Sequence, residues 1–377
     1  MRIAFYAPMK PPDHAVPSGD REMARNFVAA LRLLGHEVEV VSRFQSFSSK
    51  PSLERLETLR TDAGSERARI AERWQARGAP HAWFTYHPYY KSPDLLGPDL
   101  CAGLGVAYVT AEASYAGKRD HDAWAPFQAA VARGLRQAAL NFAMTRQDQQ
   151  GLLQLLGRGA PVAHLPPFID TAPFEVLPAL PPRKPGAPVE LITVAMMRAG
   201  AKLRSYEFLA EALGTLTWLP WRLTIVGDGS ARGAVEAAFA RLPAEKIKWS
   251  GAVAPAEIPQ LLAQADAYVW PGFDEAYGVA YMEAQAAGLA VAALACGGIP
   301  DAVRPGETAL LAPADASAAD YARLIAELVS NADSRQRLGA NGRRFILGER
   351  SLAAAARRLE AAFSGLGLPH VLSSEPA

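Results

Sequence analysis

One stretch of the chain carries two glutamates eight positions apart with a glycine between them, Glu275-Ala276-Tyr277-Gly278-Val279-Ala280-Tyr281-Met282-Glu283. An apolar run, Ala267 to Pro271, precedes this stretch, and a pattern typical of a helix continues to Gly288. The order predicts a strand, a loop and a helix, with Glu275 in the loop and Glu283 inside the helix.

The start of this predicted helix suits a diphosphate. Free backbone N–H groups and the positive end of the helix dipole gather there, and Gly278 would let an anion approach the backbone without a Cβ in the way. We therefore expect the segment Tyr277-Gly278-Val279 to donate hydrogen bonds to a pyrophosphate. Two flanking carboxylates would accept hydrogen bonds from hydroxyls, which a nucleotide sugar carries on both sides of its pyrophosphate.

Composition narrows the class of protein. The 377 residues predict two domains, and the net charge of +1 gives no support for nucleic-acid binding. Cys101 and Cys296 are interpreted as reduced thiols, with one interdomain disulfide as the alternative.

The sequence begins with a predicted strand and no apolar run reaches about 20 residues, so we expect no signal peptide and no membrane span. A cytoplasmic location follows, with any membrane contact peripheral and at the inner face.

Strands and helices alternate along both halves of the chain, a pattern typical of doubly wound parallel sheets. A proline-rich segment without periodicity separates the halves and is interpreted as a linker. The predicted organisation is an N-terminal domain over 1–170, a linker over 171–188, a C-terminal domain over 189–350, a helix over 351–366 and a tail over 367–377.

With these motifs in order, the chain resembles glycosyltransferase family 4. The E-x7-E stretch is followed by a glycine pair at 297–298 and preceded by two further glycine-containing motifs, Ile225-Val226-Gly227-Asp228-Gly229 and Trp249-Ser250-Gly251. Ser18-Gly19-Asp20 and Leu34-Gly35-His36 fit the family's N-terminal half. The resemblance implies a GT-B fold: two Rossmann-like domains facing across a cleft. The acceptor would bind the first domain and the nucleotide sugar the second.

The resemblance also assigns roles to single residues. It implies that Glu275 faces the donor sugar's hydroxyls and Glu283 the ribose hydroxyls, and that Arg198 and Lys202 stabilise the departing diphosphate. Arg204 is the alternative to Lys202, because the spacing is irregular. Gly227 and Gly19 would approach the donor. The implied reaction is a metal-independent transfer from a nucleoside-diphosphate sugar to an acceptor hydroxyl, with retention at the anomeric carbon and no cofactor.

One departure from the family concerns the first domain. Many members carry a histidine after the strand equivalent to residues 106–110, whereas this chain has Glu112 there. Glu112 is the candidate to contact the acceptor or donor sugar and act as a hydrogen-bond acceptor or base, with His121 as a more distant candidate. Asp20 and Arg21 are interpreted as a helix cap and a surface charge, with contact to a ligand as the alternative.

Other features have two interpretations each. Asp120-His121-Asp122 resembles a metal motif but follows no apolar strand, so it is interpreted as a polar loop. The aromatic run at 83–90 fits either an acceptor site or the core, and the arginine-rich helix at 58–77 fits a solvated face better than an anionic-lipid contact. Two other functions are kept open: a sugar-nucleotide epimerase of the same fold and a catalytically silent nucleotide-sugar-binding protein. The sequence does not indicate the donor base, the sugar, the acceptor or the oligomeric state.

Overall fold

The computed structural model describes residues 1–16, 18–177 and 186–368, which form two α/β units. The first unit comprises Met1–Pro166 together with the chain from Leu352, and the second comprises Pro167–Ser351. Each unit contains one six-stranded sheet in which all neighbouring strands run parallel. The prediction of two doubly wound parallel sheets is therefore confirmed.

The first unit has the strand order β2-β1-β3-β4-β5-β6, with helices before and after its strands. Its strands are β1 (Arg2–Tyr6), β2 (Glu37–Val40), β3 (Ala82–Tyr86), β4 (Ala107–Ala111), β5 (Leu140–Ala143) and β6 (Val162–His164). Its α-helices are α1 (Gly19–Leu33), α2 (Leu53–Arg77), α3 (Gly97–Leu104), α4 (Ala125–Gln137), α5 (Arg146–Leu156) and α14 (Leu352–Ser364).

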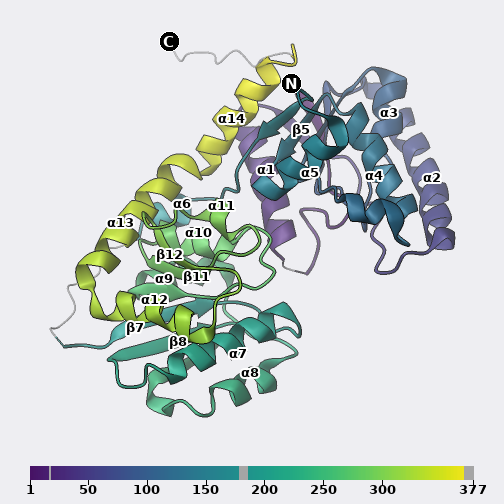
Figure 1. Ribbon diagram of the computed structural model, residues 1–377. Coiled ribbons are helices and arrows are strands. Elements are labelled where there is room, and N and C mark those ends of the chain that lie inside the picture. The colour runs from purple at the N-terminus through teal and green to yellow at the C-terminus, as the bar shows by residue number, and fades with distance from the viewer. Residues whose placement is uncertain (17, 178–185, 369–377) are drawn as a thin grey trace, which may run out of the picture. The chain divides into compact units, whose positions relative to one another are not determined.

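The last described helix completes the core of the first unit. Helix α14 packs against α1, as Figure 1 shows. The ring of Phe363 lies 6.2 Å from those of both His36 and Phe142, and its side chain is buried. A chain segment from the far end of the sequence thus covers apolar surface that the first 166 residues would leave open.

The second unit has the strand order β12-β11-β10-β7-β8-β9. Its strands are β7 (Val189–Val194), β8 (Trp221–Val226), β9 (Ile247–Gly251), β10 (Ala267–Val269), β11 (Ala290–Leu294) and β12 (Ala309–Ala312). Its α-helices are α6 (Ala172–Glu175), α7 (Ala201–Gly214), α8 (Arg232–Phe239), α9 (Ile258–Ala263), α10 (Val279–Ala286), α11 (Ile299–Ala302), α12 (Ala318–Ser330) and α13 (Ala332–Glu349).

The strand order of the second unit reverses at β7, which pairs with β8 on one side and β10 on the other. In open parallel sheets, ligands bind outside the carboxyl ends of the strands at such a reversal. The loops that follow β7 and β10 are those that carry Arg198 and Glu275.

Several helices have no counterpart in the sequence prediction, namely α3, α5, α12 and α13. Helix α5 begins with a capping box in which Thr145 and Asp148 exchange hydrogen bonds, a signal that the sequence carries in Thr-x-x-Asp.

Within the segment interpreted as a linker, α6 is a short helix, and 178–185 lie outside the described residues. Residues 369–377 of the predicted tail also lie outside them. No described helix has the length and apolarity that a bilayer crossing requires.

Candidate functional site

Four loops meet at the carboxyl ends of β7, β8, β10 and β11. The N–H of Met197 donates to the carbonyl of Asp228, and the N–H of Gly298 donates to the carbonyl of Glu275, both at 2.9 Å. The loop after β8 requires a glycine at position 227. A Cβ on Gly227 would lie 1.9 Å from the carbonyl oxygen of Ala195. This close packing holds the four loops together around the strand reversal.

Lys202 and Glu275 are brought together by these loops. The Nζ of Lys202 lies 2.5 Å from the Oε2 of Glu275, and it also lies over the ring of Trp270 at 5.7 Å. Lys202 belongs to the first turn of α7, not to the preceding loop, because Gly200 with φ 83° turns the chain into the helix early. Arg204, the alternative cation, stacks on Phe273 at 3.9 Å.

The start of α10 presents backbone donors. Gly278 occupies the N-cap with φ 70°, and the N–H groups of Val279 and Ala280 have no backbone acceptor among the described residues. The side chain of Tyr277 is buried, so its backbone is the part that a ligand can meet. Glu283 lies half-buried within α10.

Arg198 lies exposed in the loop between β7 and α7. Its side chain makes no hydrogen bond or ion pair with another described residue. A cation that the folded chain leaves unpaired, beside the strand reversal, is available to an anionic ligand.

Two residues of the same loops, Asp274 and Cys296, were not assigned to the donor site from the sequence. Asp274 has φ 53°, which is uncommon for a residue with a side chain. The thiol of Cys296 donates to the carbonyl of Gly272 at 3.2 Å, and burial, followed by the charges of Asp274 and Glu275, raises the pKa of Cys296. The thiol is therefore neutral near pH 7 and poorly reactive. Only positive backbone angles and contacts, neither of which the sequence shows, mark these two positions.

In the first unit, the loop before α1 differs from the sequence interpretation. Ser18 is the N-cap, and its side chain accepts from the N–H of Arg21, so Asp20 is not the cap. Arg21 donates to the carbonyls of His14 and Ala15. A Cβ on Gly19 would meet nothing within 4 Å, so packing inside the unit does not require glycine there.

Asp20 and Glu112 instead converge on a histidine. The Nδ1 of His87 lies 3.3 Å from the Oδ1 of Asp20 and 3.3 Å from the Oε1 of Glu112. His87 and Glu112 are the residues that follow β3 and β4, whose last residues Tyr86 and Ala111 are register partners. Both have left-handed backbones, with φ 57° and 56°.

Burial and charge set the protonation of this cluster. Burial disfavours the imidazolium, but the charges of Glu112 and Asp20 outweigh it and raise the pKa of His87 to about 9. Burial raises the pKa of Glu112 to about 8, against the opposing effect of His87. Glu112 therefore does not stand alone where the family has its histidine. His87 was missed because it was seen only as part of an aromatic run; its position directly after a strand was the local signal that the sequence carried.

The remaining candidates of the first unit are distributed elsewhere. Asp120 accepts from the hydroxyl of Tyr115, Asp122 pairs with Arg119, and His121 is exposed, so these residues form no common cluster. The aromatic run divides: β3 is buried in the core, while Tyr89 and Tyr90 are half-buried beyond its end.

The arginines of α2 are used in internal contacts. Arg60 and Arg69 pair with Glu57 and Glu66 on the same helix. Arg67 pairs with Asp99, and Arg73 with Glu39. This pairing agrees with the interpretation of α2 as a solvated face.

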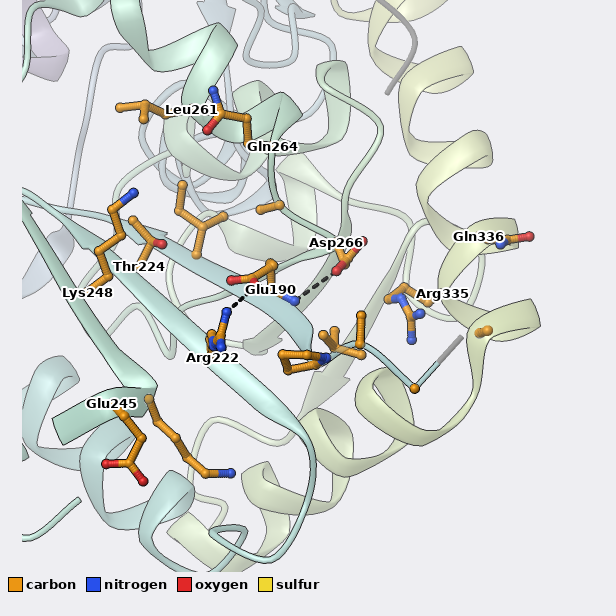
Figure 2. Close-up of a pocket in the computed structure, with 18 residues that line it drawn as sticks. Glu190, Arg222, Thr224, Glu245, Lys248, Leu261, Gln264, Asp266, Arg335 and Gln336 are labelled. Carbon is orange, nitrogen blue, oxygen red and sulfur yellow. Dashed lines mark hydrogen bonds and ion pairs between the residues drawn. The ribbon is translucent and has the colours of Figure 1, made fainter. Parts of the chain in front are cut away.

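A pocket of about 950 Å³ lies at the other end of the second sheet, where β7, β8 and β9 begin. Three of its polar residues already have partners: Glu190 pairs with Arg222, and the Oδ2 of Asp266 accepts from the N–H of Glu190, as Figure 2 shows. This pocket is remote from the carboxyl ends of the strands, and we do not assign the function to it.

Comparison with known proteins finds similarity mainly in the second unit. Residues 182–345 match the family described as glycosyl transferases group 1. A D-inositol 3-phosphate glycosyltransferase of Streptomyces coelicolor is 35% identical over 96 residues, covering 26% of this chain and 21% of the relative. A GDP-mannose-dependent alpha-(1-6)-phosphatidylinositol monomannoside mannosyltransferase of Mycobacterium tuberculosis is 30% identical over 203 residues, covering 50% of this chain and 52% of the relative. The chain thus spans about half, or less, of these curated relatives.

The whole fold also has counterparts among solved structures. The crystal structure of Anabaena HepE in complex with UDP aligns with a TM-score of 0.71, covering 97% of this chain and 100% of the other at 16% identity. A sucrose-phosphate synthase from Thermosynechococcus elongatus aligns with the same TM-score and identity. The fold is therefore GT-B, built from two Rossmann-like units, and the similarity to the group 1 glycosyltransferase family lies in the second unit.

Proposed function

We propose that the protein is a retaining glycosyltransferase that moves a sugar from a nucleoside-diphosphate sugar to an acceptor hydroxyl. The observation that carries the proposal is the assembly of Lys202, Glu275 and the start of α10 at the strand reversal of the second unit. A cation, a carboxylate and unpaired backbone donors suit the phosphates and hydroxyls of such a donor.

Each group of the second unit has a role in this reaction. Arg198, Lys202 and the backbone at Tyr277, Gly278 and Val279 neutralise the diphosphate as it leaves, so that no metal ion is needed there. Glu275 and Glu283 accept hydrogen bonds from the donor sugar and the ribose, and Gly227 keeps the neighbouring loop close. The group 1 family match and the UDP complex of the HepE protein support a nucleotide-sugar donor.

The first unit is proposed to bind the acceptor, with Glu112 contacting the acceptor or the donor sugar and Gly19 approaching the donor. No carboxylate of the site is assigned as a nucleophile, which suits a front-face displacement in which the leaving phosphate receives the acceptor's proton. The sugar then keeps its anomeric configuration. The protein is proposed to act in the cytoplasm, with any membrane contact peripheral.

The test begins with donor binding. Calorimetric titration with uridine, guanosine and adenosine diphosphates and their sugars, in the presence of EDTA, should give one tight nucleotide. Glu283→Gln should weaken it by roughly tenfold, because one charge-assisted hydrogen bond is lost. The matched control is Glu211→Gln, an exposed glutamate on α7.

Transfer is tested with the nucleotide so found. Its sugars are incubated with a panel of hydroxyl acceptors, and the anomeric configuration of the product is read by NMR. An inverted product would contradict the retaining mechanism. Nucleotide binding that is lost in Glu211→Gln but kept in Glu283→Gln would contradict the donor site.

A further inference from the structure

We propose that Asp20, His87 and Glu112 of the first unit bind one divalent transition-metal ion of the Zn²⁺ class. Among the residues that the structure describes, this is the group of three histidine, cysteine or acidic side chains whose ligand atoms all lie within 4.8 Å of one another. One imidazole and two carboxylates are a donor set that suits such ions. The proposal does not depend on the proposed function.

The two distances from His87 match those across a shared ion, and the ligand oxygens of Asp20 and Glu112 lie within 4.8 Å of each other. An imidazolium that donates to a carboxylate lies about 2.7–2.9 Å from one oxygen. Here the Nδ1 of His87 is equidistant, at 3.3 Å, from an oxygen of Asp20 and an oxygen of Glu112, and it makes no hydrogen bond. A tetrahedral ion with bonds of about 2.0–2.1 Å places neighbouring ligand atoms about 3.3 Å apart.

The burial of Glu112 is the second, independent observation. Its side chain is 6% exposed, and its Oε2 has no hydrogen-bond partner. Ionising a buried carboxylate is costly unless a cation neutralises it, and the hydroxyl of Tyr86 offsets this cost only in part. Asp148 of α5 adds a further negative charge that acts on both Glu112 and His87. Without a metal ion, protons on His87 and Glu112 offset these charges, and a divalent ion would take their place.

The backbone holds the three ligand atoms in place without the ion. The N–H of His87 donates to the carbonyl of Ala111 at 2.8 Å, and that of Glu112 donates to the carbonyl of Phe142 at 3.0 Å. The left-handed angles at His87 and Glu112 cost energy. The His87 ring stacks on Tyr89 with its centroid 4.7 Å away.

One side of the cluster is open. The side chains of His87 and Asp20 are 18% and 32% exposed, whereas Glu112 closes the base. An ion held by three ligands of this kind keeps at least one position for water or another oxygen ligand, as open zinc sites do. We therefore infer an exchangeable site, not a closed structural one.

The experiment uses the full chain after EDTA treatment and dialysis. Titration with Co²⁺ is followed by visible absorption, and titration with Zn²⁺ by calorimetry. We expect one ion per chain with micromolar or tighter affinity, and the intense visible bands of low-coordinate Co²⁺. Asp20→Asn, at a half-buried position outside the core, should weaken binding at least tenfold, and His87→Gln at least 100-fold. His121→Gln, at an exposed histidine, is the control and should bind as the native chain does.

Three results would overturn the site. One is the lack of Co²⁺ bands and of one-to-one Zn²⁺ binding in the native chain. Another is equal affinity in Asp20→Asn, His87→Gln and the native chain. The third is a ¹⁵N NMR titration in which His87 gains and loses a proton identically with and without Zn²⁺, which would show an imidazolium between two carboxylates. Nucleotide titration of the same EDTA-treated protein reports on the donor site separately.

Discussion

Lys202 and Glu275 form an ion pair that links the first turn of α7 to the loop after β10, with 2.5 Å between Nζ and Oε2. The two side chains are 27% and 22% exposed, so water still screens the pair. Such a pair contributes at most about 1 kcal/mol to the free energy of unfolding. Its larger consequence is that an ammonium group is fixed beside the start of α10, before any ligand arrives.

Replacing Lys202 should therefore affect ligand binding more than folding. We expect Lys202→Met to weaken nucleoside-diphosphate binding roughly 10- to 100-fold, since one charge-assisted contact is lost, and to change the unfolding free energy by less than about 1 kcal/mol. Calorimetry and thermal unfolding measure the two effects. Lys248→Met is the control, because Lys248 is exposed and lines the large pocket at the other end of the sheet. A loss of binding in Lys248→Met but not in Lys202→Met would place the nucleotide in that pocket.

Gly227 provides a prediction about the loops. An alanine there would place its Cβ 1.9 Å from the carbonyl oxygen of Ala195 and would need a backbone of φ 144°. We expect Gly227→Ala to lower the unfolding free energy of the second unit by about 1–3 kcal/mol and to reduce nucleotide binding. Gly233→Ala, in α8 with open space around its Cβ position, should be neutral or stabilising by up to about 1 kcal/mol. Similar losses in the two variants would show that the close packing of the loops is not needed.

The sequence predicted what depends on local pattern. The strand that begins at Ala267 and the placement of Glu275 in a loop and Glu283 in a helix follow from apolar runs and glycine, and the structure has them as predicted. It could not show that Lys202 would pair with Glu275, because the two are far apart in the chain. His87 became a candidate only when the pairing of β3 with β4 placed it beside Glu112. Contacts between neighbouring strand ends depend on strand order, which periodicity does not reveal.

Asp94 is the most connected buried carboxylate of the first unit. Its Oδ1 accepts from the N–H groups of Leu96 and Gly97 at the start of α3. Its Oδ2 accepts from the side chains of Trp83, Thr85 and Tyr108. We expect Asp94→Ala to lower the unfolding free energy of the unit by about 3–5 kcal/mol, because these buried donors lose their acceptor. Hydrogen exchange in α3 measures the effect. Exchange as slow as in the native chain would contradict it.

The same residue gives a dependence on pH. Burial raises the pKa of Asp94 above its ordinary value, against the hydrogen bonds that lower it. A carboxyl whose pKa is higher in the folded state stabilises the fold at pH values below its unfolded pKa of about 3.9, and this contribution is lost as pH rises through the folded pKa. The native chain should therefore lose stability relative to Asp94→Asn as pH rises out of the acid range. A difference that grows in the opposite direction would contradict the dominance of burial.

Phe363 tests whether α14 is part of the first unit's core. Its side chain is 2% exposed and packs against His36, next to α1, and Phe142 in β5. Phe363→Ala should lower the unfolding free energy of the first unit by about 3–5 kcal/mol through lost burial and a residual cavity. Urea unfolding monitored by hydrogen exchange in α1 and β5 separates this effect from the second unit, whose exchange should not change. The control is Arg357→Ala, an exposed position on the same helix, which should stay within about 0.5 kcal/mol of the native chain. If α1 and β5 were equally protected in both variants, α14 would be an accessory helix whose apolar face adds little to the core.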